Sequence, residues 1–141
     1  MKKIAVVLCG SGFKDGSEIR ESVAVLWGLS RLGAQVQCFA PDRPQTDVIN
    51  CLTGKPSSGE TRNMLTEAAR IARGEILPLT QLRASQFDAV IIPGGFGVAK
   101  NLCTFATEGS KGKVLQEFKD ALVEFHDQHK PIGAVCIAPA A

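Results

Sequence analysis

The sequence predicts an α/β domain in which a flavodoxin-like, doubly wound parallel sheet lies between two layers of helices, forming a three-layer sandwich. Four short apolar runs, at residues 2–9, 34–40, 87–93 and 131–135, alternate with segments of helical periodicity. This alternation is typical of a parallel sheet with crossover helices. The runs are continuous rather than alternating in polarity, as in strands buried on both faces. The 141 residues suit one domain with its own core.

The first strand–helix–strand unit occupies residues 2–40. Gly10 ends the first run, and Asp15 with Glu18 three residues later resembles a capping box for a helix over residues 18–32. The apolar residues of this helix recur at helical spacing: Ile19, Val23, Leu26, Trp27 and Leu29. The strand at 34–40 follows, so a right-handed crossover and a parallel pairing are expected.

The rest of the chain continues the alternation of strands and helices. In order, the sequence predicts an insertion with a short hairpin at 46–60, a helix at 61–73 that ends at Gly74, irregular structure at 76–82, the third strand at 87–93, a short helix at 98–105, a longer helix at 113–129 and the fourth strand at 131–135. We expect residues 1–141 to form a single domain.

Composition excludes several classes of partner. Apolar residues make up 45% of the chain and the net charge is +2 with no basic run, so neither nucleic acid nor a membrane is the expected partner. The apolar runs are too short to span a bilayer, and the N-terminus lacks the pattern of a signal peptide. The five cysteines include no C-x-x-C pair, which favours free thiols in a reducing compartment. We therefore expect a cytoplasmic protein.

Cys136 is the candidate nucleophile. It directly follows the fourth apolar run and precedes small residues, a layout that resembles a nucleophile elbow, where a sharp strand-to-helix turn exposes one side chain. A helix N-terminus there would favour the thiolate, the reactive form of cysteine. The alternative is a buried structural cysteine, as most free cysteines are. The others fit that description better, since Cys9, Cys38 and Cys103 lie in or beside apolar segments and Cys51 lies in the insertion.

Two further groups belong to the same predicted edge of the sheet, because loops at the carboxyl ends of parallel strands form the ligand crevice. The turn at Gly94 and Gly95 can present N–H groups as an oxyanion hole, or it is only a tight turn. Glu18 and Glu21 begin the first helix, where a carboxyl group can exchange a proton with the thiol or simply complement the helix dipole.

Two other kinds of site are weaker alternatives. Gly10, Gly12 and Gly16 follow the first strand and Asp42 ends the second, an arrangement that resembles a dinucleotide-binding fold but departs from its G-x-G-x-x-G spacing. His126 and the nearby His129 offer two metal ligands without the third that a zinc site needs. No cofactor and no metal are therefore expected.

The chain resembles a known superfamily through motifs along its whole length. The matching segments are D-G-S-E-I-x-E at residues 15–21, F-A-P-D at 39–42, T-R-N-x-L-x-E-A-A-R-I-A-R-G at 61–74, P-G-G-F-G-x-A-K-N-L at 93–102 and C-I-A-P at 136–139. They are similar to the superfamily of PfpI-type proteases, parkinsonism-associated deglycases and class I glutamine amidotransferase-like domains. Within it, the chain looks like the ElbB branch of enhancing-lycopene-biosynthesis or glyoxalase proteins, which has mitochondrial relatives in animals.

The resemblance implies roles for particular residues. Cys136 is the implied nucleophile, Gly94 and Gly95 the oxyanion-hole donors, and Glu21 the helix glutamate that contacts the cysteine, with Glu18 as the alternative acid. Ile137 stands at the substrate site, where protease-type members have a histidine.

The function expected from the resemblance is a cysteine-dependent glyoxalase or deglycase, a lyase or hydrolase acting on small α-dicarbonyls such as glyoxal. The runner-up is a non-catalytic or redox-sensing domain of the same fold, and a dinucleotide-binding domain is the third possibility. A homodimer is the expected assembly. Because relatives continue for several strands and helices beyond the elbow, the 141 residues are expected to be the N-terminal part of the domain and weakly active alone.

Overall fold

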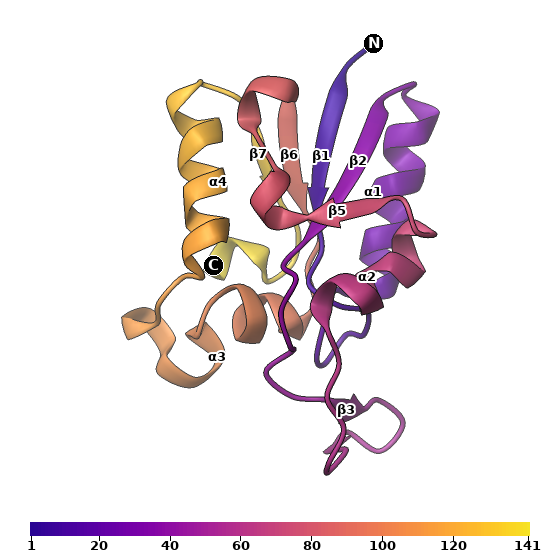
Figure 1. Ribbon diagram of the computed structural model, residues 1–141, viewed down its shortest axis with the longest axis vertical. Helices are drawn as coiled ribbons and strands as arrows, with labels where there is room; N and C mark the ends of the chain where they lie inside the picture. The colour runs from indigo at the N-terminus through magenta and orange to yellow at the C-terminus, as the bar shows by residue number, and fades with distance from the viewer.

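A five-stranded parallel sheet forms the centre of the molecule in the computed structural model, which describes residues 1–141 (Figure 1). The strands stand in the order β5-β2-β1-β6-β7, and every neighbouring pair is parallel. Their bounds are β1 Lys3–Val7, β2 Gln35–Ala40, β5 Ile76–Pro78, β6 Ala89–Ile92 and β7 Ile132–Ala134. The predicted α/β class with a parallel sheet between helices is confirmed.

Four of these strands are the predicted ones, and they have the flavodoxin-like order second, first, third, fourth. The fifth, β5, extends the sheet beyond β2, where Cys38 pairs with Ile76 and Ala40 with Pro78. The prediction of irregular structure at 76–82 was wrong here. A three-residue edge strand that ends in proline carries too little periodicity to be recognised, although proline is well tolerated at a sheet edge.

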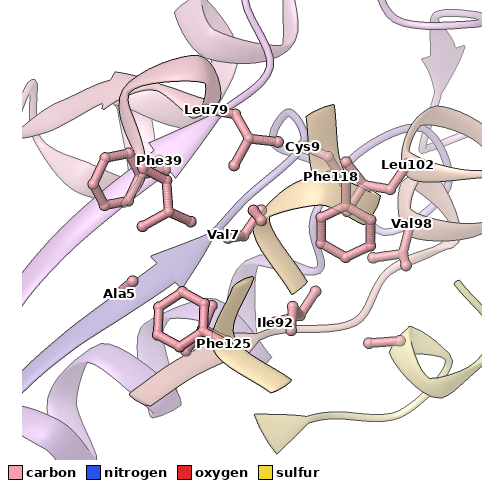
Figure 2. Close-up of a cluster of buried hydrophobic side chains, with 14 of the residues drawn as sticks. Ala5, Val7, Cys9, Phe39, Leu79, Ile92, Val98, Leu102, Phe118 and Phe125 are labelled. Atoms are coloured by element: carbon pink, nitrogen blue, oxygen red, sulfur yellow. The ribbon is translucent and has the colours of Figure 1, made fainter. Parts of the chain in front are cut away.

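Helices cover both faces of the sheet (Figure 1), and a separate cluster is buried on each; Figure 2 shows the larger of the two. On one face α1 (Ile19–Arg31) and α2 (Met64–Ala72) pack over Val6, Leu8 and Cys38. On the other face α4 (Gln116–Asp127) contributes Phe118 and Phe125, which meet side chains of β1, β2 and β6. Burying side chains of this size contributes about 1.5–3 kcal/mol each.

The helix ends differ from the predicted ones in instructive ways. Glu18, not Asp15, caps α1, and its carboxylate accepts the Glu21 N–H at 2.7 Å. Asp15 is buried and accepts the N–H of Ile49 at 2.8 Å instead. The segments predicted as helices at 61–73 and 113–129 are shorter by a few residues at their starts, with α2 capped by the side chain of Asn63.

Residues 98–111 do not form the single short helix predicted at 98–105. The structure has a π-helical turn η3 (Val98–Leu102), the short helix α3 (Phe105–Glu108) and a 3-10 turn η4 (Gly109–Lys111). Further 3-10 turns are η1 (Leu79–Gln81), η2 (Ala84–Gln86) and η5 (Ala138–Ala140).

The predicted insertion contains the predicted hairpin. Strands β3 (Ile49–Asn50) and β4 (Lys55–Pro56) pair antiparallel, and this hairpin extends past the carboxyl ends of the sheet strands, at the bottom of Figure 1. The Asp15 carboxylate ties it to the loop after β1. The hairpin therefore forms part of the surface around the edge of the sheet where a ligand crevice is expected.

One side of α1 leaves apolar residues uncovered. Ile19, Val23 and Trp27 are 47%, 50% and 63% exposed, so the helical stripe that the sequence shows is only partly buried against the sheet. None of the helices combines the length and apolar character needed to cross a membrane.

Candidate functional site

The candidate site lies at the carboxyl ends of β1, β6 and β7. From β1 the chain continues to β2 and β5 on one side of β1, and it later returns to form β6 and β7 on the other side. The direction in which strands are added therefore reverses between β1 and β6. In doubly wound sheets a crevice opens at this point. Three connections meet here: the loop from β1 to α1, the turn after β6 and the turn after β7.

Cys136 has the backbone conformation of an elbow. Its φ angle is +56°, one of three positive values at non-glycine residues in the chain. Cys136 is also exposed to solvent. A non-glycine residue held in this region costs about 1–3 kcal/mol, and such strain is frequent at functional sites. After Cys136 the chain enters the 3-10 turn η5. The reactivity of the Cys136 thiol is therefore argued from its exposure and from nearby N–H groups, and not from a helix dipole.

Glu21 and Cys136 meet across Gly94. The Gly94 N–H donates to the Glu21 carboxylate at 2.8 Å. A Cβ at Gly94 would lie 2.4 Å from that Glu21 oxygen and 2.7 Å from the Cys136 Cβ. The carboxylate oxygen and the Cys136 Cβ are therefore no more than about 5 Å apart. Only glycine fits between them.

This geometry corrects one predicted role. Gly94 was predicted to be an oxyanion-hole donor, but its N–H is already occupied by the Glu21 carboxylate. Neither the Gly95 N–H nor the Ile137 N–H donates a hydrogen bond within the chain. Gly95 has a φ of +105°, and its backbone packs against the start of α1. The available donors at the site are thus Gly95 and Ile137, and Gly94 fixes the carboxylate.

A shallow pocket of about 220 Å³ opens over the thiol. Seven residues line it: Phe13, Glu18, Glu21, Gly95, Phe96, Cys136 and Ile137. The structure thus brings all the predicted site residues together, and all of them except Gly94 line the pocket. Glu18 uses its carboxylate to cap α1 at the Glu21 N–H, so Glu21 is the carboxylate placed beside Cys136.

Three of the other cysteines are buried, and the fourth lies on the hairpin. Burial raises the pKa of the Cys9 thiol to about 12, and burial raises the pKa of the Cys38 thiol to about 11. Cys103 is also buried, and its thiol donates to the Val98 carbonyl oxygen at 3.4 Å. Cys51 is exposed. A protonated, buried thiol is a poor nucleophile, so Cys136 and Cys51 are the two accessible thiols.

The glycine loop after β1 does not form a nucleotide site. A Cβ at Gly16 would lie 2.5 Å from the Ser11 nitrogen, and one at Gly10 would lie 2.7 Å from the Gln45 side chain, so the chain itself fills the loop. Asp42 accepts a hydrogen bond from Asn63 at 2.8 Å, at the start of α2. The dinucleotide interpretation is therefore wrong, because the glycines serve close packing of the backbone.

The two histidines lie away from the thiol pocket. His126 is in the last turn of α4, with its ring 3.4 Å from Asp127, and His129 follows that helix. The helix precedes β7, so both lie toward the opposite edge of the sheet. No group of three or more His, Cys, Asp or Glu side chains in the chain is arranged to hold a metal ion.

Sequence reasoning missed Asn101, a buried residue that joins three loops. Its amide nitrogen donates to the carbonyl oxygens of Cys9 and Asp15 at 3.2 and 2.9 Å, and its oxygen accepts the Thr46 N–H at 2.9 Å. The available signal was the asparagine in the matched segment at residues 93–102, since a buried polar side chain needs partners. Phe13 and Phe96 line the pocket; Phe96 lies in the matched segment at residues 93–102, but nothing in the sequence indicated that either ring borders the site.

Curated relatives match almost the whole chain. It is 57% identical over 137 residues to the human glutamine amidotransferase-like class 1 domain-containing protein 3, mitochondrial, covering 97% of this chain and 51% of that protein. It is 56% identical to the rat mitochondrial ES1 protein homolog over 137 residues, with 97% and 52% covered. The chain spans about half the length of these relatives. No protein-family model matches it.

Solved structures share the fold. The crystal structure of an isoprenoid biosynthesis protein with an amidotransferase-like domain from Ehrlichia chaffeensis superposes with a TM-score of 0.92 at 45% identity, covering 99% of this chain and 63% of that one. Oxidized DJ-1 of Toxoplasma gondii, at 19% identity and a TM-score of 0.53 over 99% of this chain and 58% of its own, shares the fold alone.

The comparisons also correct the expected location. The human, rat and zebrafish relatives are mitochondrial proteins, which contradicts the prediction of a cytoplasmic one. Free cysteines indicate a reducing compartment and do not say which one. The predicted resemblance is confirmed: the chain is similar over almost its whole length to the glutamine amidotransferase-like class 1 and ES1 proteins, and it shares the fold of DJ-1 superfamily structures.

Proposed function

We propose that this chain carries the thiol site of a cysteine-dependent enzyme of glyoxalase or deglycase type, which acts on small α-dicarbonyls such as glyoxal. The observation that carries the proposal is the exposed Cys136 at a positive φ, beside the Glu21 carboxylate and in the lining of the thiol pocket. An accessible thiol, a carboxyl group and free N–H donors are what carbonyl addition requires.

The proposed chemistry begins with addition of Cys136 to one aldehyde carbon of glyoxal. A sulfur–carbon bond forms, the carbonyl π bond breaks, and the thiol proton passes through Glu21 to the new oxygen, giving a hemithioacetal. The N–H groups of Gly95 and Ile137 are the proposed donors to that oxygen while it is negatively charged. No oxidant or reductant is consumed in this step.

Turnover then needs an isomerisation and a hydrolysis. Glu21 would move a proton from the hemithioacetal carbon to the neighbouring carbonyl group, which converts the adduct into a thioester of glycolate. Water then cleaves the thioester, releasing glycolate and restoring the thiol. Glyoxal and water thus give glycolate and a proton, so the scheme balances with the residues of the chain and solvent.

The test is conversion of glyoxal to glycolate by the wild type and by Cys136→Ser. We expect the variant to lose at least about 100-fold in rate, since a hydroxyl is a much weaker nucleophile than a thiolate. Cys51→Ser is the matched control, because it removes the other exposed thiol and leaves the pocket intact. Equal rates for Cys136→Ser and wild type would refute the proposal.

A redox-sensing role is the second candidate, and the exposure of Cys136 favours it. None of the residues that line the pocket is a histidine, so Glu21 is the proton-transfer group on which turnover would depend. In this alternative, mild peroxide converts Cys136 to a sulfenic acid that a thiol reductant restores. Reversible oxidation without glyoxal turnover would support this candidate over the first.

We also propose that residues 1–141 form the N-terminal part of a single class I glutamine amidotransferase-like domain, and that this part includes the nucleophile elbow at Cys136. The homodimer remains a prediction, and sedimentation equilibrium would test it. The exposed stripe of Ile19, Val23 and Trp27 on α1 is a surface on which such a contact can be sought by substitution.

A further inference from the structure

A second pocket adjoins the thiol pocket. It has a volume of about 360 Å³ and is lined by Phe13, Lys14, Ile49, Gly54, Phe96 and Lys100. The rings of Phe13 and Phe96 line both pockets. A molecule whose carbonyl carbon lies at Cys136 can therefore extend along these two rings into the second pocket.

The charges of the second pocket are positive. The Lys14 ammonium lies 5.6 Å from the centroid of the Phe13 ring, and the Lys100 ammonium lies 5.3 Å from that of Phe96. Asp47 pairs with Lys100 at 2.8 Å. Lys14 makes no salt bridge and no side-chain hydrogen bond, so one positive charge in the pocket is uncompensated.

The walls of this pocket are fixed to the core. The Phe96 N–H donates to the Phe13 carbonyl oxygen at 2.8 Å, which joins the loop after β1 to the turn after β6. The Ile49 N–H donates to the buried Asp15 carboxylate at 2.8 Å, which holds the hairpin at the wall of the pocket. The pocket is therefore built before a ligand arrives, and preorganisation of this kind favours binding.

We propose that the second pocket binds the anionic group of the carbonyl substrate through Lys14. The preferred substrates are then aldehydes or dicarbonyls that carry a phosphate or carboxylate a few atoms from the reactive carbon. The inference rests on the proposed function and adds the substrate class to it. The two pockets differ in charge: Glu18 and Glu21 line the thiol pocket, and the lysines line the second. An anionic tail is repelled from the first and attracted to the second, which orients the carbonyl end toward Cys136.

The test compares D-glyceraldehyde with D-glyceraldehyde 3-phosphate, which differ by one phosphate. Each is used to protect Cys136 against iodoacetamide, with the modified residue located by mass spectrometry. We expect the phosphate compound to protect at a concentration about tenfold lower than the neutral one. Lys14→Gln should remove most of this difference without changing protection by D-glyceraldehyde. Lys119→Gln, at an exposed position on α4, is the control for the loss of one positive charge.

A second readout separates the pocket from the carbonyl chemistry. The ratio of Cys136 alkylation rates with iodoacetate and iodoacetamide reports anion attraction alone, and Lys14→Gln should lower this ratio several-fold while Lys119→Gln leaves it unchanged. If both aldehydes protect equally and the ratio does not respond to Lys14→Gln, the anion pocket is refuted and the proposed function stands. If neither aldehyde protects but the ratio falls in Lys14→Gln, the second pocket stands as an anion site and addition of these two aldehydes to Cys136 is refuted, while glyoxal turnover still tests the proposed function.

Discussion

Cys9 and Cys136 each lie two residues beyond the end of a parallel strand, at the same edge of the sheet, and yet their thiols are in opposite environments. Cys9 follows the central strand β1 and is fully buried, with its sulfur 3.6 Å from the Ser17 hydroxyl. Cys136 follows β7, the last strand of the sheet, and is exposed at a φ of +56°. Both cysteines follow a strand end, so this position alone does not explain why one thiol is accessible and the other is not.

The segment that follows each strand explains why Cys9 is buried and Cys136 is exposed. The loop after β1 folds back over Cys9, and the Ser17 hydroxyl accepts the Cys9 N–H at 2.9 Å. The chain after Cys136 turns away into η5, which leaves the thiol facing the pocket. Burial disfavours the thiolate at Cys9 and raises its pKa to about 12. One sheet edge thus carries a structural thiol and a candidate nucleophile.

The largest expected effect is the contrast in alkylation between these two thiols. The pKa of Cys9, raised to about 12 from 9.0, lowers its thiolate fraction near neutral pH about a thousandfold. We therefore expect Cys136 to react with iodoacetamide at least about a thousandfold faster than Cys9 in the folded protein. Mass-mapped labelling over time measures both rates. Modification of Cys9 at a comparable rate, while circular dichroism shows a folded chain, would contradict this account of the burial of Cys9.

Gly94→Ala should destabilise the fold and disturb the site together. The new methyl group would lie 2.4 Å from the Glu21 carboxylate oxygen and 2.7 Å from the Cys136 Cβ, and overpacking of this kind costs about 1–3 kcal/mol. The free energy of unfolding in urea measures the loss, and the Cys136 alkylation rate reports the site. Gly28→Ala is the control, since nothing lies within 4 Å of its added methyl and the position is helical. That variant should be as stable as the wild type or more so, and equal losses in both would refute the close approach.

Alkaline pH should weaken the fold through its buried thiols. The pKa of Cys9 is raised to about 12 and that of Cys38 to about 11, both by burial. Each buried thiol contributes to the free energy of unfolding in full below pH 9, the ordinary pKa of a thiol. This contribution is lost as the pH rises toward the pKa of the thiol in the folded chain, because the unfolded chain releases the proton first. The slope reaches about 1.4 kcal/mol per pH unit for each thiol. Unfolding free energies between pH 8 and pH 10.5 should fall less steeply in Cys9→Ala than in Cys51→Ser, and parallel curves would contradict the assignment.

Glu21→Gln is expected to have the smallest and most specific effect. The amide keeps an oxygen for the Gly94 N–H but removes a negative charge within about 5 Å of the Cys136 Cβ. Alkylation of Cys136 should become several-fold faster, and glyoxal turnover should fall because the proton-transfer group is gone. Glu18→Gln should change both rates much less, since that carboxylate caps α1. Unchanged alkylation and turnover in Glu21→Gln would return Glu21 to a purely structural role.

Patterns that repeat along the chain were predictable, and contacts between distant loops were not. Apolar runs and helical spacing located four strands and the main helices, because burial imposes a period on the sequence. The strand Ile76–Pro78 is too short to show one. At the site, the sequence indicated Cys136 and the two glutamates, but it could not show that the Gly94 N–H binds Glu21, since these residues are 73 positions apart. The same limit hid Asn101, whose partners lie in two separate loops, after β1 and after β2.

The exposed hairpin cysteine provides the most direct test of the central claim, that the elbow and not exposure alone makes Cys136 the reactive thiol. Cys51 and Cys136 are both exposed, but only Cys136 has a positive φ and stands beside the free N–H groups of the pocket. Site-resolved iodoacetamide rates at neutral pH compare the two within one molecule. We predict that Cys136 reacts about tenfold faster than Cys51. Equal rates, or a faster Cys51, would contradict the claim.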